Sequence, residues 1–355
     1  MKTIIVSDKI TQEAKNLVNG VYSPLGGFLN LKEMKSVLND MRLPGGEVWS
    51  MPIIFDVNEE EKKQLWGEEE FKVIGEKEGE EFIIKNIEIY KFDKKYFVGK
   101  LFGTSKKEHP GVQETLKMGD WLVGGRIFPV KESIYDNFFF SPSRSREFFK
   151  EKEWKTIVAF QTRNAPHCSH EHLQKCGLNE ADGLFIQPII GPKKIGDFKD
   201  DHIMGAYQLL IEKYFPKDRA MLGIFKTFMR YAGPKEAVFH ALVRKNFGCT
   251  HMIIGRDHAG VGDFYGTFDA QKIFENFSEK ELGVRILKYD NASFCKECKK
   301  VVFDCDCPHE NSNKIFLSGT ELRRKLLNNE DIPEEFMRRE IKEYLLNNKD
   351  NLFVK

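Results

Sequence analysis

The sequence lacks the features that would place it in several large classes of protein. No apolar run reaches the roughly 18 residues of a membrane-spanning helix, and the apolar start of MKTIIVSDKI is too short for the hydrophobic part of a signal peptide. The net charge is only +1, so a broad nucleic-acid-binding surface is not indicated. Repeats and low-complexity tracts are also missing. We therefore expect a cytoplasmic protein whose partners are neither membranes nor nucleic acids.

Two common nucleotide-binding motifs are absent as well. There is no GxxxxGK[ST] loop, which argues against a P-loop kinase, and no GxGxxG follows a strand-like run, which argues against a dinucleotide-dependent dehydrogenase. Cysteine is scarce, with seven in the chain, and four of these crowd near the C-terminal end. This distribution favours a reduced chain with a metal site over a framework of disulfides.

The pattern of apolar residues divides the chain into three parts. Residues 1–150 predict a β-rich domain with few long helices, from the short apolar runs Trp49–Val57, Phe82–Tyr90 and Tyr96–Leu101. Residues 151–315 alternate between strand-like and helix-like segments, which predicts an α/β domain with a parallel sheet. Its expected strands are Thr156–Phe160, Leu184–Ile190, Ala220–Ile224 and His251–Ile254, and its expected helices include His202–Tyr214 and Lys235–Asn246. Residues 316–355 predict a small helical tail.

The strongest functional signal follows the first of these strands. The strand ends in Gln161, Thr162, Arg163 and Asn164, and a helix that carries His167 and His170 is expected to run to Gly177. Free N–H groups and the positive end of the helix dipole at such a junction suit phosphate. Histidines three apart share one helical face, and Arg163 offers a planar fork for a tetrahedral oxyanion. We expect a polyphosphate and a second anion here, although a polar loop with satisfied histidines is the simpler alternative.

Two more loops fall at the carboxyl ends of expected strands, where parallel sheets bind ligands. GRDHAGVGDFYG, residues 255–266, follows the strand HMII, and its glycines allow a ligand to approach the backbone closely. Arg256 and His258 could contact anions or a base, but an ordinary turn is an equal alternative. MRYAGPKEA, residues 229–237, predicts a helix that begins near Pro234. Its Arg230 is a candidate ligand contact.

The cysteine-rich segment is typical of a tetrahedral zinc site. Cys295-x-x-Cys298 is followed by Cys305-x-Cys307-x-His309, so five candidates compete for four positions. We favour Cys295, Cys298, Cys307 and His309 as the ligands, which leaves Cys305 spare. A site of four protein ligands has no open position, so we expect the zinc to be structural. The alternative is a chance cluster of reduced cysteines.

These segments, in this order, resemble the ATP sulfurylases (sulfate adenylyltransferases). QTRN followed by His167 and His170 resembles the family's QxRN…HxxH motif. MRYAGPKEA and GRDHAG are nearly identical to segments of the family's sequences. Further similar segments are YSPLGGFL at 22–29, QP…GPK…GD within 187–197 and LSGTELR at 317–323. One departure is Cys168-Ser169, which stands where an arginine is common between the two histidines.

The resemblance implies a fold, a reaction and a set of site residues. The fold would be a PUA-like N-terminal domain followed by a Rossmann-like nucleotidyltransferase domain. The reaction would convert ATP and sulfate to adenosine 5′-phosphosulfate and diphosphate with Mg²⁺, in a stand-alone homodimer with a zinc loop. Gln161 and Arg163 would hold sulfate, and His167 and His170 would contact the phosphates. Thr162, Arg163 and Asn164 would be catalytic together with the two histidines. The residues implied to bind ATP or sulfate also include Asn164, Gly255, Arg256, Asp257, His258 and Ala259.

Two other functions stay open at this point. The first is another α/β nucleotidyltransferase that joins ATP to a different acceptor. The second is a nucleic-acid-binding protein that combines a PUA-like domain with a zinc site. Sulfate has no proton to lose and needs no general base, so alignment and charge neutralisation would have to drive its attack. The Gln161–Arg163 pair suits that task and favours sulfate.

Overall fold

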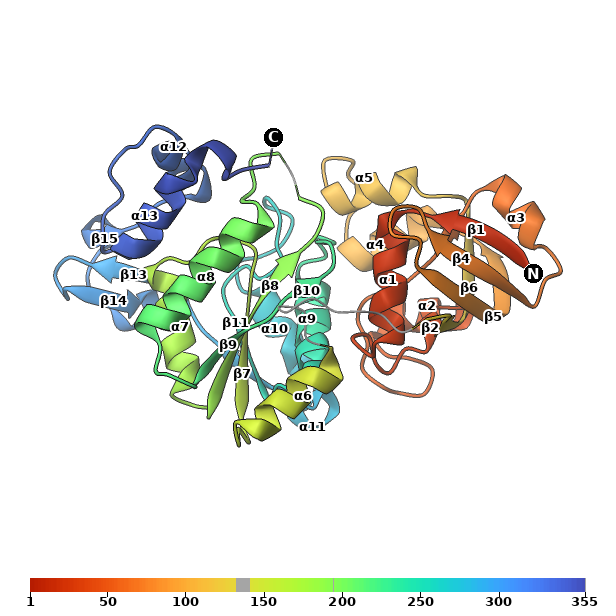
Figure 1. Ribbon diagram of the computed structural model, residues 1–355, viewed down its shortest axis with the longest axis horizontal. Coiled ribbons are helices and arrows are strands. Elements are labelled where there is room, and N and C mark those ends of the chain that lie inside the picture. Colours follow the sequence, from red (N-terminus) through yellow and green to blue (C-terminus); the bar gives the residue numbers. More distant parts are fainter. Residues whose placement is uncertain (132–140, 194, 355) are drawn as a thin grey trace.

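The computed structural model describes residues 1–131, 141–193 and 195–354, which form two lobes (Figure 1). The N-terminal lobe is built on a mixed sheet in the order β1-β4-β5-β6-β2, with β3 paired to β6. Its strands are β1 (Lys2–Val6), β2 (Gly27–Phe28), β3 (Asp56–Val57), β4 (Glu70–Gly75), β5 (Glu81–Lys91) and β6 (Trp121–Pro129). Its helices are α1 (Asp8–Val18), α2 (Leu31–Asp40), α3 (Glu59–Leu65), α4 (Lys94–Phe102) and α5 (Pro110–Lys117).

Two of the three strands expected in this lobe are corrected by the structure. Phe82–Tyr90 lies within β5, as expected, but Tyr96–Leu101 forms helix α4. Asp93 caps that helix by accepting a hydrogen bond from the Tyr96 N–H at 2.9 Å, and Gly103 ends it in a left-handed conformation. Of Trp49–Val57, only Asp56–Val57 pairs as a strand. A short buried apolar run satisfies a strand, a helix or a buried loop equally well, so periodicity alone could not decide.

The second lobe contains the expected parallel sheet, in the order β10-β8-β7-β11-β12 with β9 also paired to β8. The strands are β7 (Ile157–Thr162), β8 (Gly183–Ile190), β9 (Ala220–Leu222), β10 (Phe225–Lys226), β11 (His251–Ile254) and β12 (Arg285–Lys288). Every pair in this sheet is parallel, and β7 aligns Gln161 with Gln187 of β8. The strands are buried on both faces, which explains their continuous apolar sequences.

Helices cover both faces of this sheet. Val158 and Phe160 point into one core, which is shared with α7 (Cys168–Leu178), α8 (Asp200–Tyr214), α12 (Gly319–Leu327) and α13 (Arg339–Asn347). Ile157 and Ala159 point into the other core, which is shared with α6 (Pro142–Glu151), α9 (Pro234–Phe247) and α10 (Asp269–Lys272). Short helices η1 (Ile273–Asn276) and α11 (Glu279–Leu282) lead to β12. The C-terminal helices thus complete one face of the sheet.

The expectation that the helix with His167 and His170 ends at Gly177 is wrong. Helix α7 continues to Leu178 and Asn179 is its C-cap. Gly177 lies where the helix crosses the sheet, and a Cβ built there would stand 2.7 Å from Ile253 Cδ1 and 3.1 Å from Val158 Cγ2. Glycine at this position therefore allows α7 to pack closely on β7 and β11.

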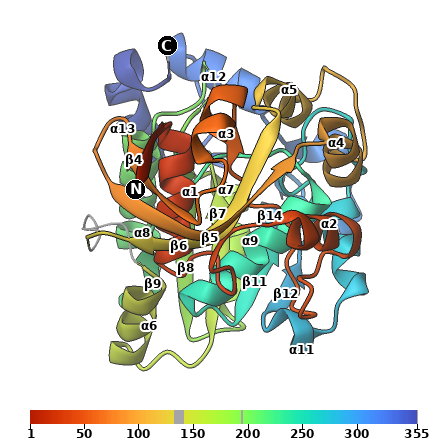
Figure 2. The same cartoon turned by 90° about the vertical axis from the view of Figure 1, so that its right-hand side faces the viewer.

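The two lobes share one hydrophobic core. Tyr22 of the N-terminal lobe lies edge-on to Phe225, with ring centroids 6.4 Å apart, and Trp49 lies edge-on to Phe239 at 5.7 Å. A buried ion pair between Glu13 and Arg230 crosses the same interface. The view in Figure 2 shows the N-terminal sheet in front of the second lobe. The first lobe therefore packs, through apolar contacts and this ion pair, against the segment that precedes α9.

Helix α6 belongs structurally to the second lobe. It packs against α9, and Ser145 Oγ donates to the Phe247 carbonyl at 2.6 Å, so residues 142–151 pack with the second lobe. The division of the chain at residues 150 and 315 stays a prediction.

Among the described residues, no helix is both long and apolar enough to cross a membrane.

Candidate functional site

The loops singled out from the sequence meet at the carboxyl edge of the parallel sheet. A cavity of about 380 Å³ lies there, between the N-terminal end of α7 and the turn after β11. The expected site residues that line it are Gln161, His167, His170, Gly255, Arg256, Asp257 and His258. Arg163 lines a smaller neighbouring cavity instead. Thr162, Asn164 and Ala259 line neither cavity, so the structure does not bring them to the open part of the site.

Thr162 and Asn164 shape the loop between the strand and the helix. Thr162 is buried, and its Oγ1 accepts the Asn164 N–H and donates to the Asn164 carbonyl, both at 3.2 Å. These local bonds fix the direction in which the exposed Arg163 leaves the sheet. Their contribution to the site is therefore one of backbone geometry.

His167 and His170 form a stacked pair at the beginning of α7. Their ring centroids are 3.8 Å apart, and Phe336 stacks on the outer face of His167 at 5.1 Å. His167 is the N-cap residue and makes no side-chain cap. The Cys168 N–H donates to the Phe336 carbonyl at 2.8 Å, so it is the next N–H groups of the first turn of α7 that could meet a ligand. Tyr207 OH lies 3.3 Å from His170 Nδ1. A hydroxyl that donates to Nδ1 places the imidazole proton on Nε2.

Both imidazoles of this pair are neutral in the free protein. Burial lowers the pKa of His167 to about 4, and burial together with the neighbouring His167 lowers the pKa of His170 well below its usual value. Neutral rings still donate one N–H each, and a bound polyphosphate would favour their protonation. The pair can therefore take up negative charge as it develops on a phosphate.

The smaller cavity carries charges of both signs. It is lined by Arg163, Asp197 and Lys193, and the ammonium group of Lys193 is paired with Asp200. Tyr231 lies beneath Arg163, with 5.9 Å between the guanidinium carbon and the ring centroid. Gly191 closes the cavity at a φ of 152°, and a Cβ there would collide with the Thr227 carbonyl oxygen at 2.2 Å. Only glycine therefore fits where β8 turns into this loop.

The turn after β11 has an unusual backbone. Asp257 and Ala259 both adopt left-handed conformations, with φ of 54° and 59°. Such residues cost free energy and persist only where surrounding bonds hold them. Here the Asp257 N–H donates to the Thr267 carbonyl at 2.9 Å, and the Ala259 carbonyl accepts from the Gly233 N–H at 3.2 Å. The first bond ties the turn to the residue before Phe268, the N-cap of α10, and the second ties it to Gly233, the N-cap of α9.

Several residues of the larger cavity were not expected from the sequence. Asp290 and Asn291 follow β12, a strand that the sequence reasoning did not anticipate, and Phe336 comes from the segment between α12 and α13. Phe316 and Leu317, the first residue of LSGTELR, complete the wall. Strand β12 ends at Lys288, and ligand-binding loops follow the ends of parallel strands. Recognising this short strand in the sequence would have pointed to Asp290 and Asn291.

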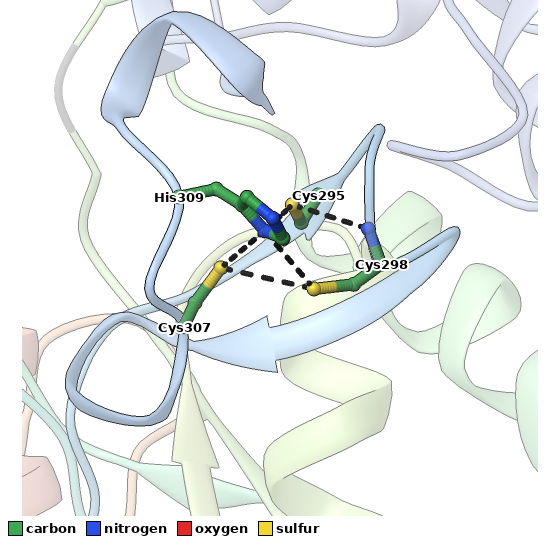
Figure 3. Close-up of side chains that lie close together, drawn as sticks. All are labelled: Cys295, Cys298, Cys307 and His309. Carbon is green, nitrogen blue, oxygen red and sulfur yellow. Dashed lines mark hydrogen bonds between the residues drawn. The ribbon is translucent and has the colours of Figure 1, made fainter.

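The cysteine-rich segment forms a compact cluster on a small antiparallel sheet (Figure 3). The sheet consists of β13 (Ala292–Cys295), β14 (Lys300–Phe303) and β15 (Lys314–Ile315) and packs on α7. It brings together Cys295, Cys298, Cys307 and His309, whose potential ligand atoms all lie within 4.8 Å of one another. Cys305 is exposed on a one-turn helix, η2 (Asp304–Asp306), and its Sγ donates to Asp306.

The spacing of these atoms fits a tetrahedral zinc ion. Zn–S bonds of about 2.3 Å at tetrahedral angles place two sulfurs about 3.8 Å apart. Cys298 Sγ and Cys307 Sγ are 3.9 Å apart, and His309 Nδ1 lies 3.4 Å from both Cys295 Sγ and Cys298 Sγ. The backbone N–H of Cys298 points at Cys295 Sγ and lowers the pKa of that thiol to about 7. A metal cation would complete this arrangement.

The parallel sheet, with the histidine pair and the strained turn at its carboxyl edge, defines an α/β protein of the type that binds ligands at strand ends, here joined to a β-rich domain. Comparison with protein families narrows that class. The ATP-sulfurylase family matches residues 136–348, and the PUA-like domain matches residues 1–132. The chain belongs to the ATP-sulfurylase family.

Curated relatives agree with this assignment over almost the whole chain. Proteins named sulfate adenylyltransferase from Halothermothrix orenii, Pyrococcus abyssi and Ignicoccus hospitalis are 42%, 43% and 41% identical to it. The matches cover 93%, 96% and 99% of this chain and 88%, 89% and 91% of those proteins. The expected two-domain α/β and β fold is confirmed.

A solved structure of a differently named protein shares the fold. The hexameric APS kinase from Thiobacillus denitrificans superposes with a TM-score of 0.74 over 98% of this chain, at 19% sequence identity. The chain spans 63% of the length of that protein. At this identity the likeness concerns the fold alone.

Proposed function

We propose that the chain is a sulfate adenylyltransferase, which joins sulfate to the α-phosphate of ATP and releases diphosphate. The observation that carries the proposal is that the single segment from Gln161 to His170 places a histidine pair on one cavity at the sheet edge and Arg163 on a second cavity. The larger cavity, with His167 and His170, has room for a nucleotide, and the smaller one beside it presents Arg163. Relatives that carry this activity by name match the chain over most of its length.

The reaction requires alignment rather than acid–base chemistry. Arg163 and Gln161 would hold sulfate so that one of its oxygens faces the α-phosphorus, in line with the departing diphosphate. The bond from the α-phosphorus to the bridging oxygen breaks as the new S–O–P bridge forms, and diphosphate leaves with the electron pair. His167 and His170 donate N–H groups to the charge that builds on the diphosphate side. No side chain acts as a nucleophile.

Two metals belong to the proposal. Mg²⁺ typically binds through substrate phosphates with one or two carboxylates, and Asp257 and Asp290 are the carboxylates that line the larger cavity. When bound with ATP, Mg²⁺ would neutralise charge on the phosphates. Zn²⁺ would be held by the four clustered ligands and would fix the small sheet against α7, away from any chemical step.

The assembly and the compartment are also proposals. The family resemblance supports a homodimer, which size-exclusion chromatography with light scattering tests directly. The free thiols of the zinc cluster must stay reduced to bind metal, which supports the cytoplasm as the working compartment.

The experiment that tests the function is sulfate-dependent release of diphosphate from ATP and Mg²⁺, compared between the wild type and Arg163→Ala. We expect release that needs sulfate and that falls by more than about 10²-fold in the variant, the scale for loss of one key charge-stabilising donor. Release without any sulfate dependence would refute the proposal and favour a nucleotidyltransferase with another acceptor. RNA binding that weakens with salt, without diphosphate release, would favour the nucleic-acid alternative.

A further inference from the structure

The first lobe reaches toward Arg163 through one buried histidine. His109 is completely buried and is the N-cap residue of α5. Its ring nitrogen Nε2 lies 3.0 Å from the carbonyl oxygen of Tyr231, in the segment that precedes α9. The ring of Tyr231 lies beneath the guanidinium group of Arg163. These contacts connect the beginning of α5 to the side chain that we propose to hold sulfate.

The backbone at the beginning of α5 fixes the protonation of the His109 ring. Nδ1 accepts the N–H groups of Gly111 and Val112 at 3.1 and 3.3 Å, so Nδ1 carries no proton. The ring proton is therefore on Nε2, on the side that faces Tyr231. His109 is thus both the cap of α5 and a donor to the second lobe.

The carbonyl oxygen of Tyr231 accepts two side-chain donors. One is the N–H group at His109 Nε2, and the other is the hydroxyl of Tyr265 at 2.9 Å. Burial raises the pKa of Tyr265, so this hydroxyl keeps its proton. A carbonyl oxygen has two lone pairs and can accept both protons. The distance of 3.1 Å between His109 Nε2 and the Tyr265 oxygen follows from this shared acceptor and needs no proton of its own.

Tyr231 needs such bonds because its backbone is strained. It adopts a left-handed conformation with a φ of 58°, which is unfavourable for a bulky side chain and persists only where surrounding bonds hold it. The neighbouring N–H groups of Arg230 and Ala232 donate to the carboxylate of Glu236 at 2.9 and 3.0 Å. Helix α9 therefore holds the N–H groups of this segment, while the two side-chain donors hold its carbonyl.

Helix α5 lies directly against the same segment. A Cβ built at Gly111 would stand 2.7 Å from the carbonyl oxygen of Arg230 and 2.6 Å from the ring of Phe102. Glycine therefore allows the first turn of α5 to approach the backbone beside Tyr231. Phe102 also packs on the imidazole of His109, with ring centroids 4.7 Å apart. The cap bonds and this contact together limit how far the imidazole can turn away from Tyr231.

The direction of Arg163 depends on the ring beneath it. Arg163 is exposed, and its long side chain has many rotamers, so a clamp for an anion requires a surface that limits them. Tyr231 supplies that surface, with 5.9 Å between the guanidinium carbon and the ring centroid, in the wall of the cavity that both residues line. A rotation of the Tyr231 backbone would carry the ring away from Arg163.

We propose that His109 is a positioning residue for sulfate, which holds the strained backbone of Tyr231 and thereby the ring on which Arg163 lies. The inference rests on the proposed function. It also gives the N-terminal lobe a part in sulfate binding. Among residues 1–131, 141–193 and 195–354, those that line the two cavities at the sheet edge all belong to the second lobe. The influence of the first lobe on the anion would therefore pass through Tyr231.

Two substitutions at His109 separate positioning from helix capping. Asparagine keeps a side-chain oxygen for the first N–H groups of α5, but its amide is too short to reach Tyr231. Glutamine can place its NH₂ group near the position of Nε2 but loses the cap. Both substitutions remove the ring that packs on Phe102, so this loss is matched between them.

The two variants should differ in opposite directions for binding and for stability. We expect His109→Asn to raise the KM for sulfate about 2- to 10-fold, the scale of one hydrogen bond, with an unchanged KM for ATP. His109→Gln should have a KM for sulfate closer to the wild type and should unfold at a lower temperature than His109→Asn, because its helix has lost its cap.

A double-mutant cycle tests whether the effect passes through Tyr231. Tyr231→Asn removes the ring, and asparagine tolerates the left-handed conformation. We expect this variant to raise the KM for sulfate, and the addition of His109→Asn to raise it further by less than about twofold, because both changes remove the same support. Independent, multiplying increases would show that His109 acts by another route and would overturn the inference.

Tyr265→Phe keeps the inference testable if the His109 variants do not fold. It removes one hydroxyl and its bond to the Tyr231 carbonyl, and it should also raise the KM for sulfate without changing the KM for ATP. The matched control is His251→Asn, which replaces a buried histidine at the opposite end of β11 and should leave the KM for sulfate unchanged.

The failure of this inference can be distinguished from the failure of the proposed function. An unchanged KM for sulfate in His109→Asn and Tyr265→Phe would overturn the inference while the proposed function stands. An equal rise in His109→Asn and His109→Gln would do the same, since it would follow from loss of the ring alone. A wild type without sulfate-dependent release of diphosphate would refute the proposed function itself.

Discussion

Replacing Gly177 with alanine tests how α7 is held against the sheet. In a helix interior, alanine is more favourable than glycine by about 1 kcal/mol. The added Cβ, however, would stand 2.7 Å from Ile253 Cδ1 and 3.1 Å from Val158 Cγ2, and both of these side chains belong to buried strands. Overpacking of this kind costs about 1–3 kcal/mol. The difference predicts a net destabilisation of about 0–2 kcal/mol, or a fall in Tm of up to about 8 °C for a unit of this size.

The same substitution should also impair the reaction, because α7 carries the histidine pair at its beginning. Displacing catalytic groups by about 1 Å can cost about 10²-fold in rate, so we expect a lower kcat in Gly177→Ala. Gly99→Ala is the matched control, since Gly99 is an exposed position inside α4 where an added Cβ meets nothing within 4 Å. That variant should be stabilised by about 1 kcal/mol with unchanged kcat. If thermal unfolding shows the same gain in both variants, the close approach of α7 to the sheet is not what requires glycine.

Three further predictions concern stability. Cys298→Ser should abolish the binding of one zinc ion per chain, measured by metal analysis, and should lower the Tm. The control Cys305→Ser should change neither. An equal loss of zinc in both variants would mean that the ligands are not the four clustered residues. Glu13→Gln should lower the free energy of unfolding by about 3–5 kcal/mol, because Arg230 would remain buried without its carboxylate partner. The control Glu78→Gln removes an exposed ion pair and should lower the free energy of unfolding by less than about 1 kcal/mol. The folded state resists protonation of His167 and His258, whose pKa values of about 4 and about 3 lie below the ordinary value of about 6.5. The unfolded chain takes up these protons first, so the Tm should fall as the pH drops from about 6.5 to about 4; a Tm that is constant across this range would contradict their burial.

Much of the second lobe could be predicted because its signals are local and consistent. The expected strand His251–Ile254 matches β11 residue for residue, and the expected helix His202–Tyr214 falls within α8. A parallel sheet follows from strand–helix alternation, and its ligand edge follows from the sheet. For this reason the sequence alone predicts that the loops with Gln161, His167 and His258 meet at one edge of the sheet.

The features that escaped prediction depend on contacts distant in sequence. Nothing local distinguishes a glycine that ends a helix from one that allows a helix to cross a strand, and Gly177 does the second because Ile253 lies beneath it. Tyr96–Leu101 became helix α4 because Asp93 and Gly103 cap it, although its apolar run also suits a strand. The contact between the side chains of Gln161 and His258, at 3.4 Å, joins residues 97 positions apart and has no signature in either segment.

The assignment of Thr162 and Asn164 as catalytic stays a prediction. Both residues lie in the loop that carries Arg163, and their mutual hydrogen bonds account for its shape. A role in shaping the loop differs from contact with the substrate. Thr162→Ser would keep the hydroxyl and Thr162→Val would remove it, so unequal losses of activity would report on these bonds.

Exchange of labelled diphosphate into ATP, measured with and without sulfate, tests the central claim most directly. Direct attack of sulfate on the α-phosphorus, with no adenylylated enzyme, means that label can enter ATP only when sulfate or adenosine 5′-phosphosulfate is present. We therefore predict exchange that depends on sulfate in the wild type and is lost with Arg163→Ala. Exchange from ATP and Mg²⁺ alone would show a covalent adenylyl-enzyme and would contradict the account.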